Sequence, residues 1–336
     1  MLYSMKKVNC LGIESTAHTF GAGIITEKGK ILSDIRDMYQ TKSGGIIPSE
    51  AAKHHKEISL KIINQALEQA KLNFKDIDLI SFSQGPGLAP CLLEGIKISK
   101  ELARKYKIKL IGINHVIAHL EIGKLLCKVK DPVYVFVSGA NTQIIFFEGK
   151  KYRIGGETLD VGLGNALDKF GREIGLGFPS GPKIEALAKN GKYTKLPYVV
   201  KGMDLSFSGI ITEAIRKFKS GIKKEDLCYS LQETCFAMLT EVTERALAHT
   251  DKNEVLLIGG VAANKRLIEM LNIMCKERNA KFYAVPLKYS GDNSSMIGWN
   301  GILQYKKNKR YYDKLNINSI DIKPRWRIDE VEVFWR

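Results

Sequence analysis

The chain has 336 residues, which exceeds the size at which a single hydrophobic core stops growing, so we expect two domains. Its composition is 44% hydrophobic and 26% charged, which is enough to form packed cores. No run approaches the roughly 20 apolar residues of a membrane-spanning helix. The sequence therefore predicts a cytoplasmic protein without a membrane partner.

The charge balance is strongly basic. The chain carries 52 Lys and Arg against 36 Asp and Glu, which gives a net charge of +16. Such an excess attracts polyanions and favours RNA as a partner. A lysine-rich solvated surface explains the same number equally well. Six scattered cysteines without a C-x-x-C pair argue against a disulfide framework and against a zinc ribbon.

The two halves of the chain share one pattern. Residues 7–32 are typical of a strand, a turn of small and hydroxylated residues, and a second strand, and residues 133–154 repeat this order. Later in each half, residues 76–105 and 253–277 show a strand, a glycine loop and a helix with apolar residues at helical spacing. The pattern predicts two duplicated α/β lobes.

The small-residue turns after these strands suggest a nucleotide site. Backbone N–H groups in such turns and at helix N-termini suit phosphate, although a single glycine turn is usually only a turn. The repeated plan resembles the actin, Hsp70 and sugar-kinase superfamily, with two lobes around a central nucleotide cleft. We expect lobe one at 1–131 with a C-terminal return at 298–336, and lobe two at 132–297. The first turn has Glu14-Ser15-Thr16 where those kinases usually have Asp, which argues against kinase chemistry.

A metal site is indicated by two histidines. His115 and His119 follow the apolar segment 109–114 at i, i+4 spacing, so a helix places both imidazoles on one face. Neutral imidazole suits Zn and Fe(II), and a carboxylate from elsewhere would complete the set of ligands. The alternative is a pair of polar histidines on a helix surface. The position at the end of a strand, where α/β folds place their sites, favours the metal.

Two other functions share some of these features. A metalloprotease needs Glu directly after the first histidine, but this chain has Val116, and Glu121 lies about 200° around a helix from His119. An ATP-driven switch of the Hsp70 type would use the same nucleotide cradle without needing metal-binding histidines. Val116 therefore argues against the metalloprotease, and the H-x-x-x-H helix argues against the ATP-driven switch.

Taken together, the motifs resemble the universal tRNA N(6)-adenosine threonylcarbamoyltransferase family, on the archaeal and eukaryotic branch that supplies the catalytic subunit of the KEOPS complex. The C-terminal motif favours this branch over the bacterial one. The resemblance covers nearly the whole chain and rests on GIESTAHTFGAGI, IIPSEAAKHH, QGPGLAPCL, INHVIAHLE, VSGANTQI, GNALDKFGREIGLGFPSGPKIE, DLSFSGI, GGVAANKRL, GDNSSMIGWNG and KPRWRIDEVEVFWR.

The resemblance implies a metal-dependent acyltransferase. It would move the threonylcarbamoyl group of L-threonylcarbamoyl-AMP to the N(6) amine of adenosine-37 in tRNAs reading codons that begin with adenine. It implies one divalent metal per subunit, with Fe(2+) favoured and Zn(2+) as the alternative. The implied partners are tRNA and the other KEOPS subunits, including a small protein-kinase-like ATPase.

The resemblance also assigns site residues. It implies His115, His119 and Asp292 as metal ligands, although Asp292 taken alone is typical of a cap on the following helix. The remaining acidic candidates taken alone would be solvated or capping carboxylates. No residue stands out as a general base. The implied substrate-binding residues are Phe136, Val137, Ser138, Gly139, Ala140, Asp168, Gly181, Glu185 and Asn264.

The chain departs from the family pattern at two positions. Phe136 stands where this branch usually has a metal-binding Tyr, so the protein ligands fall to three unless Tyr134, on the same face of a strand, substitutes. Ala140 stands where a glycine is usual, which is tolerable only if its φ is negative. The basic tail with Lys323, Arg325 and Arg327 is expected to contact tRNA, and the alternative is that it packs on the first lobe.

Overall fold

The computed structural model describes residues 8–40 and 46–336. The chain forms two compact units. One comprises Met1–Leu125 with Asp292–Arg336, and the other comprises Leu126–Gly291. The boundaries expected from the sequence, after residues 131 and 297, lie a few residues further along the chain.

The first unit contains a five-stranded sheet in the order β3-β2-β1-β4-β5. Strands β1, β2 and β3 form an antiparallel meander, and β4 and β5 run parallel to β1. The strands are β1 (Asn9–Glu14), β2 (Thr19–Thr26), β3 (Ile31–Met38), β4 (Leu79–Gly85) and β5 (Lys109–Asn114).

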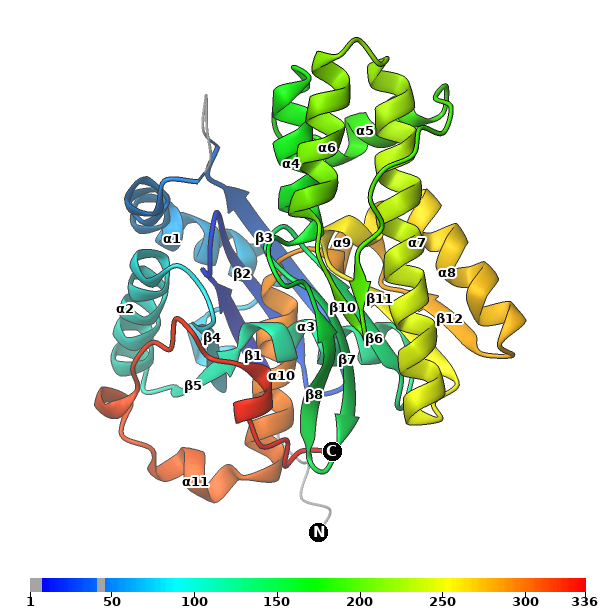
Figure 1. Cartoon of the computed structure of the whole chain (residues 1–336). Coiled ribbons are helices and arrows are strands. Elements are labelled where there is room, and N and C mark those ends of the chain that lie inside the picture. Colours follow the sequence, from blue (N-terminus) through cyan, green and yellow to red (C-terminus); the bar gives the residue numbers. More distant parts are fainter. Residues whose placement is uncertain (1–7, 41–45) are drawn as a thin grey trace. The chain divides into compact units, whose positions relative to one another are not determined.

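Helices cover both faces of this sheet. On one face Leu11 and Ile13 of β1 share a core with α1 (Pro48–Ala70) and α2 (Ala89–Tyr106), which lie side by side in Figure 1. On the other face α10 (Ser294–Lys307) crosses β1 so closely that a Cβ on Gly12 would lie 2.1 Å from the carbonyl oxygen of Ser294. Only glycine permits this approach, which fixes the start of α10 against β1.

The remaining elements of this unit connect its strands and helices or belong to its C-terminal segment. Helix α3 follows β5 directly. The bounds are η1 (Phe74–Asp76), α3 (His115–Cys127), α11 (Lys309–Lys314), η3 (Ile317–Ser319) and η4 (Ile328–Glu330).

The second unit repeats the topology of the first. Its sheet has the order β12-β11-β6-β7-β8, with an antiparallel meander from β6 to β8 and with β11 and β12 parallel to β6. Read from β8, this order matches β3-β2-β1-β4-β5, so the predicted duplication is confirmed. The strands are β6 (Val133–Val137), β7 (Thr142–Glu148), β8 (Lys151–Glu157), β11 (Glu254–Ile258) and β12 (Lys281–Ala284), and a small hairpin adds β9 (Val200–Lys201) and β10 (Asp204–Leu205).

The core of the second unit lies between this sheet and its helices. Val133, Val135 and Val137 of β6 are fully buried and alternate with Tyr134 and Phe136, which face the other side of the sheet. The helices are α4 (Leu163–Glu173), α5 (Gly181–Ala188), α6 (Ser208–Lys219), α7 (Lys224–Thr250), η2 (Gly260–Ala263), α8 (Lys265–Glu277) and α9 (Leu287–Ser290).

Two further facts concern the chain's chemistry. Within the described residues, none of the helices combines the length and the apolar content needed to cross a bilayer. All six cysteines are free thiols, and five of them are buried.

Candidate metal centre and nucleotide-binding elements

Helix α3 carries the two predicted metal-binding histidines. It begins immediately after β5, where Oδ1 of Asn114 accepts a hydrogen bond of 3.1 Å from the backbone N–H of Ile117 and so caps the first turn. One turn of helix separates His115 from His119, and their ring centroids lie 4.8 Å apart. Both side chains are buried, so the strand-to-helix junction presents two imidazoles on one face, as predicted.

Asp292 completes a cluster with these histidines. Its Oδ1 lies 3.4 Å from Nε2 of His115 and 3.3 Å from Nε2 of His119. Ligands bound at about 2.1 Å to a tetrahedral ion are separated by about 3.4 Å, so these distances suit one shared ion. The three ligand atoms lie within 4.8 Å of one another. Two nitrogens and one carboxylate oxygen are also a donor set that Fe(II) and Zn accept.

The backbone around Asp292 is held from β3. Nη1 of Arg36 donates to the carbonyl oxygen of Asp292 at 2.8 Å, and Asp34 accepts the backbone N–H of Ser294 at 3.0 Å. The N-cap of α10 is Asn293, whose side chain accepts from Met296 N. The capping role considered for Asp292 is therefore filled by its neighbour, which leaves the Asp292 carboxylate directed at the histidines.

Glu14 is a member of this cluster that the sequence did not identify. It ends β1 with no exposed surface, and its Oε2 accepts a hydrogen bond of 3.0 Å from Nδ1 of His115. Its other oxygen accepts the N–H and the hydroxyl of Thr16 at 2.7 and 2.5 Å. A buried carboxylate needs such partners. Because Glu14 occupies Nδ1, it leaves Nε2 of His115 for Asp292 and for an ion.

The electrostatics of the cluster favour a cation. Burial alone would lower the pKa of His115, but the carboxylates of Glu14 and Asp292 outweigh it and raise that pKa to about 10. Burial is the main cause that lowers the pKa of His119, so this imidazole is neutral and offers a lone pair. Burial would raise the pKa of Asp292, but the two histidines hold it well below its usual value.

Glu121, the other carboxylate of α3, is engaged elsewhere. Its Oε1 accepts a hydrogen bond of 3.0 Å from Nε1 of Trp335, and its Oε2 lies 3.2 Å from Nζ of Lys124. This confirms the expectation that Glu121 points away from the ion-binding face. A carboxylate in this position does not act as the base that a metalloprotease needs.

In the second unit, the turn after β6 packs on the start of α4. The N–H of Gly164 donates to the carbonyl oxygen of Ser138 at 3.1 Å, and the N–H of Asn165 donates to that of Gly139 at 2.9 Å. A Cβ on Gly162 or Gly164 would meet the backbone of this turn at less than 3 Å. Glycines therefore allow the small-residue turn to lie against the start of α4, whose first N–H groups donate to the turn itself.

Three further contacts in the second unit involve the other predicted substrate-binding residues or their neighbours in the chain. Gly259 has a φ of +107°, and a Cβ there would lie 2.1 Å from the carbonyl oxygen of Val137, so the loop before α8 lies against the end of β6. Asp168 of α4 accepts the N–H of Ser180 at 2.7 Å, beside Gly181. Glu185 accepts the N–H of Lys265 at 3.0 Å, beside Asn264, and Asn264 caps α8.

The two departures from the family pattern lie on β6 and in its turn. Phe136 and Tyr134 are both fully buried, and the Tyr134 ring meets the Tyr152 ring edge-on at 5.7 Å. Among the described residues, the non-glycine residues with positive φ do not include Ala140. Its methyl group therefore causes no backbone strain, which removes the concern raised by the missing glycine.

Comparison with solved structures agrees with the duplicated fold. HypF of T. kodakarensis matches with a TM-score of 0.58 over 94% of this chain and 49% of that chain, at 14% identity. Component A of the (R)-2-hydroxyglutaryl-CoA dehydratase of Acidaminococcus fermentans matches with a TM-score of 0.54 over 89% of this chain and all of that protein, at 13% identity. At such identities the likeness concerns the fold alone, which agrees with the two repeated sheets of this chain.

Sequence relatives are much closer. A tRNA N6-adenosine threonylcarbamoyltransferase from Thermococcus sibiricus is 54% identical over 97% of this chain and 99% of its own length, and one from Archaeoglobus fulgidus is 51% identical over the same shares. A probable bifunctional tRNA threonylcarbamoyladenosine biosynthesis protein of Methanosphaera stadtmanae is 51% identical over 97% of this chain and 60% of its own length. The model of the TsaD family, tRNA N6-adenosine threonylcarbamoyltransferase, matches residues 30–299. The chain therefore belongs to the TsaD family of tRNA N6-adenosine threonylcarbamoyltransferases.

Proposed function

We propose that this chain takes the threonylcarbamoyl group from L-threonylcarbamoyl-AMP and transfers it to the N6 amine of adenosine-37, in tRNAs that read codons beginning with adenine. Family membership establishes that the chain is a transferase that forms threonylcarbamoyladenosine on tRNA. The single observation that carries the finer proposal is the cluster of His115, His119 and Asp292, because this family is metal-dependent and the chain supplies a compact set of donors.

The reaction is an acyl transfer from a mixed anhydride. The amine nitrogen of adenosine forms a bond to the carbamoyl carbon, the bond from that carbon to the phosphate oxygen of AMP breaks, and AMP leaves with the electron pair while the amine loses a proton. The exocyclic amine is a poor nucleophile because its lone pair is delocalised into the ring. Catalysis must therefore rest on an activated donor, on positioning and on stabilisation of developing charge.

His115, His119 and Asp292 would hold one divalent ion. Two imidazoles and one carboxylate with open positions are typical of non-haem Fe(II) sites, so we propose Fe(2+), with Zn(2+) as the alternative. Such an ion supplies a Lewis acid and a template for the oxygens of the donor. Glu14 would fix the ring of His115 through Nδ1, and Arg36 would fix the backbone at Asp292.

The second unit would bind the adenylate part of the donor. The turn amides from Gly139 onwards would receive the phosphate, because the N–H of Ser138 already donates to the carbonyl oxygen of Asn141 at 2.8 Å. The packing of the start of α4 on this turn, and of the loop before α8 on the end of β6, supports this assignment. The full proposed set is Phe136, Val137, Ser138, Gly139, Ala140, Asp168, Gly181, Glu185 and Asn264.

The partners follow from the reaction and from the branch of the family. tRNA is the acceptor substrate, and we propose a cytoplasmic location for that reason. The C-terminal motif supports assembly with the subunits of the KEOPS complex, including a small protein-kinase-like ATPase, and the proposal includes no membrane partner.

The donor is tested by stoichiometry. The purified chain, loaded with Fe(2+) and combined with the partner subunits, is incubated with unmodified tRNA and L-threonylcarbamoyl-AMP. We expect one AMP to be released for each threonylcarbamoyladenosine formed. Formation of the modified nucleoside without matching AMP would overturn the assignment of the donor.

A further inference from the structure

The C-terminal segment crosses the carboxyl ends of β4 and β5 in the first unit. The N–H of Lys323 donates to the carbonyl oxygen of Gln84 at 2.7 Å, and the N–H of Gly87 donates to that of Pro324 at 3.1 Å. A Cβ on Gly85 would lie 1.8 Å from the carbonyl oxygen of Lys323, so the glycine loop and the tail are in direct backbone contact. The tail is thus held by main-chain atoms, which leaves its side chains available.

The same segment is tied to the start of the metal-binding helix. Nδ2 of Asn114 donates to the carbonyl oxygen of Trp326 at 3.2 Å, while its Oδ1 caps α3. Asn114 directly precedes His115 in the chain. One side chain therefore couples the position of Trp326 to the helix that carries the proposed ion ligands.

The tail both packs on its unit and presents charge. Ile328, Val333 and Trp335 are buried, whereas Lys323 and Arg325 are exposed. The two expectations for this segment were packing on the first lobe and contact with tRNA, and the packing is confirmed by the backbone bonds at Lys323 and Pro324 and by the bond from Trp335 to Glu121. The side chains of Lys323 and Arg325 nevertheless stay exposed, so their positive charges remain accessible to a ligand.

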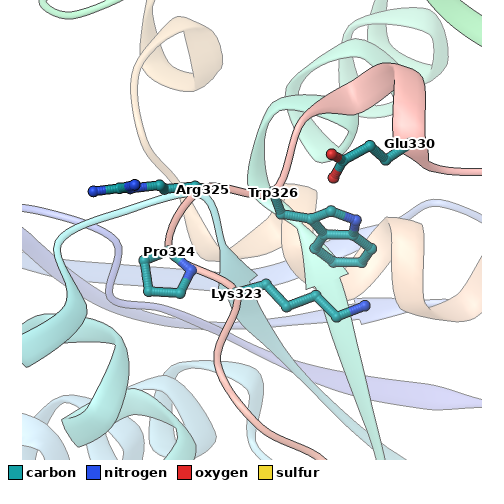
Figure 2. Close-up of a pocket in the computed structure, with 5 residues that line it drawn as sticks. All are labelled: Lys323, Pro324, Arg325, Trp326 and Glu330. Carbon is teal, nitrogen blue, oxygen red and sulfur yellow. The ribbon is translucent and has the colours of Figure 1, made fainter.

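An open hollow of about 640 Å³ lies beside the tail, lined by Lys323, Pro324, Arg325, Trp326 and Glu330. Figure 2 shows the Lys323 side chain running along the Trp326 indole, and Nζ lies 4.3 Å from the ring centroid. In the same view Arg325 extends in the opposite direction and Glu330 lies on the far side of the indole. The hollow thus combines a partly exposed indole with one cation along the ring, from Lys323, and a second, from Arg325, that extends away from it.

The charged side chains in and beside this hollow differ in whether they are already paired. Arg327 is paired with Asp329 at 3.3 Å, so it contributes little net charge. Within residues 8–40 and 46–336, neither Lys323 nor Arg325 forms an ion pair with a carboxylate. Glu330 is the acidic group facing the indole, and it disfavours a phosphate on its own side. A phosphate beside the indole is therefore directed to the face that Lys323 covers, and Arg325 supplies a second cation further along the segment.

We propose that this hollow binds one nucleotide of the single-stranded anticodon loop, with its base stacked on Trp326 and its phosphates held by Lys323 and Arg325. The base takes the face of the indole that Lys323 covers, and the flexible lysine then moves its ammonium to a phosphate. Stacking on aromatic rings next to cations is the common way in which proteins hold single-stranded nucleic acid. The inference rests on tRNA as the substrate and adds a contact outside the reacting base.

The test measures the binding of an anticodon stem-loop RNA to the full chain by fluorescence anisotropy. Trp326→Ala is expected to raise Kd about 10-fold, and Trp326→Phe, which keeps a ring, is expected to raise it less. The matched control is Tyr106→Ala, which removes another exposed aromatic ring that carries a lysine, Lys105, at the amino end of β5. This control is expected to leave Kd within about 2-fold of the wild type. The thermal midpoint of each variant confirms that it is folded.

Two further measurements separate stacking from charge. Trp326→Ala should leave the slope of log Kd against log salt unchanged, whereas Lys323→Ala and Arg325→Ala should each reduce it by about one. An abasic substitution at the stacked loop position should weaken wild-type binding, and Trp326→Ala should then have no further effect.

The proposal is overturned if the folded Trp326→Ala variant binds the stem-loop with the Kd of the wild type. It is also overturned if, for an abasic site at every loop position tested, Trp326→Ala weakens binding further. Failure of the proposed function is a different result. In that case the wild-type chain would form no threonylcarbamoyladenosine, whatever the variants do to RNA binding.

Discussion

Nδ1 of His115 donates a hydrogen bond of 3.0 Å to Oε2 of Glu14, a carboxylate that has no exposed surface. The bond links the end of the first strand to the first residue of the metal-binding helix. It fixes both the orientation of the imidazole and the nitrogen that remains for an ion. Carboxylate partners of metal-binding histidines commonly have this role.

The first prediction concerns the charge of Glu14. Glu14→Gln keeps a hydrogen-bond acceptor beside His115 but removes the negative charge that makes the imidazole a better ligand. We expect the affinity for Fe(2+) to fall by about 10- to 100-fold, measured by chelator competition on the purified protein. Glu101→Gln, at an exposed position on α2, is the matched control and should bind the ion as the wild type does. An unchanged affinity in Glu14→Gln would remove Glu14 from the site.

The second prediction concerns the ligands themselves. His115→Ala and His119→Ala each remove one of three protein donors, so we expect the bound metal to fall to background by elemental analysis and tRNA modification to be lost. Far-UV circular dichroism should retain the wild-type spectrum, because the fold of the first unit rests on its sheet and helices. His54→Ala, a replacement on α1, should keep the metal. A His119→Ala protein with full metal content would refute the ligand assignment.

The third prediction concerns the anchoring of the C-terminal segment. Nε1 of Trp335 donates to buried Glu121, and Trp335→Phe removes this donor while it keeps an aromatic ring. We expect the free energy of unfolding to fall by about 1.5 to 3 kcal/mol, measured by urea denaturation, because the lost hydrogen bond involves an acidic group. Trp299→Phe is the control, since the Trp299 indole makes no hydrogen bond within the described residues. Equal effects of the two replacements would show that the bond to Glu121 contributes nothing measurable.

The fourth prediction concerns pH. Burial, followed by the neighbouring His54, lowers the pKa of His55 from 6.5 to about 4. The folded state therefore favours the neutral ring of His55. Between pH 4 and pH 6.5 this imidazole binds more protons in the unfolded chain than in the folded one. The contribution of His55 to the free energy of unfolding should be complete above about pH 6.5. It should decrease by about 3 kcal/mol as the pH falls towards 4. His55→Gln should show a smaller decrease over the same range in urea denaturation. Parallel profiles of the two proteins would contradict the prediction.

Much of the fold could be predicted from the sequence because both halves of the chain show the same order of strand, turn, glycine loop and helix patterns. The strand, turn and strand of residues 7–32 and 133–154 became β1-β2 and β6-β7, and the glycine loops after β4 and β11 are followed by α2 and, after the short η2, by α8. The pair His115 and His119 could be found because helical spacing alone places two imidazoles on one face.

Other parts of the site depend on pairings that local patterns do not contain. Glu14 meets His115 only because β1 and β5 are brought to one sheet, although a carboxylate at the end of a buried strand already indicates that a partner must exist. Asp34 and Arg36, which hold the segment at Asp292, come from an edge strand with no distinctive motif. The assignment of the adenylate residues in the second unit stays a prediction.

The central claim is that the cluster of His115, His119 and Asp292 serves the transfer of threonylcarbamoyl to tRNA. The most direct measurement is nucleoside mass spectrometry of unmodified tRNA after incubation with the chain, its partner subunits and L-threonylcarbamoyl-AMP. We expect threonylcarbamoyladenosine at position 37 with the Fe(2+)-loaded wild type, and none with either His115→Ala or a chelator-treated wild type. Equal product from the His115→Ala protein would contradict it.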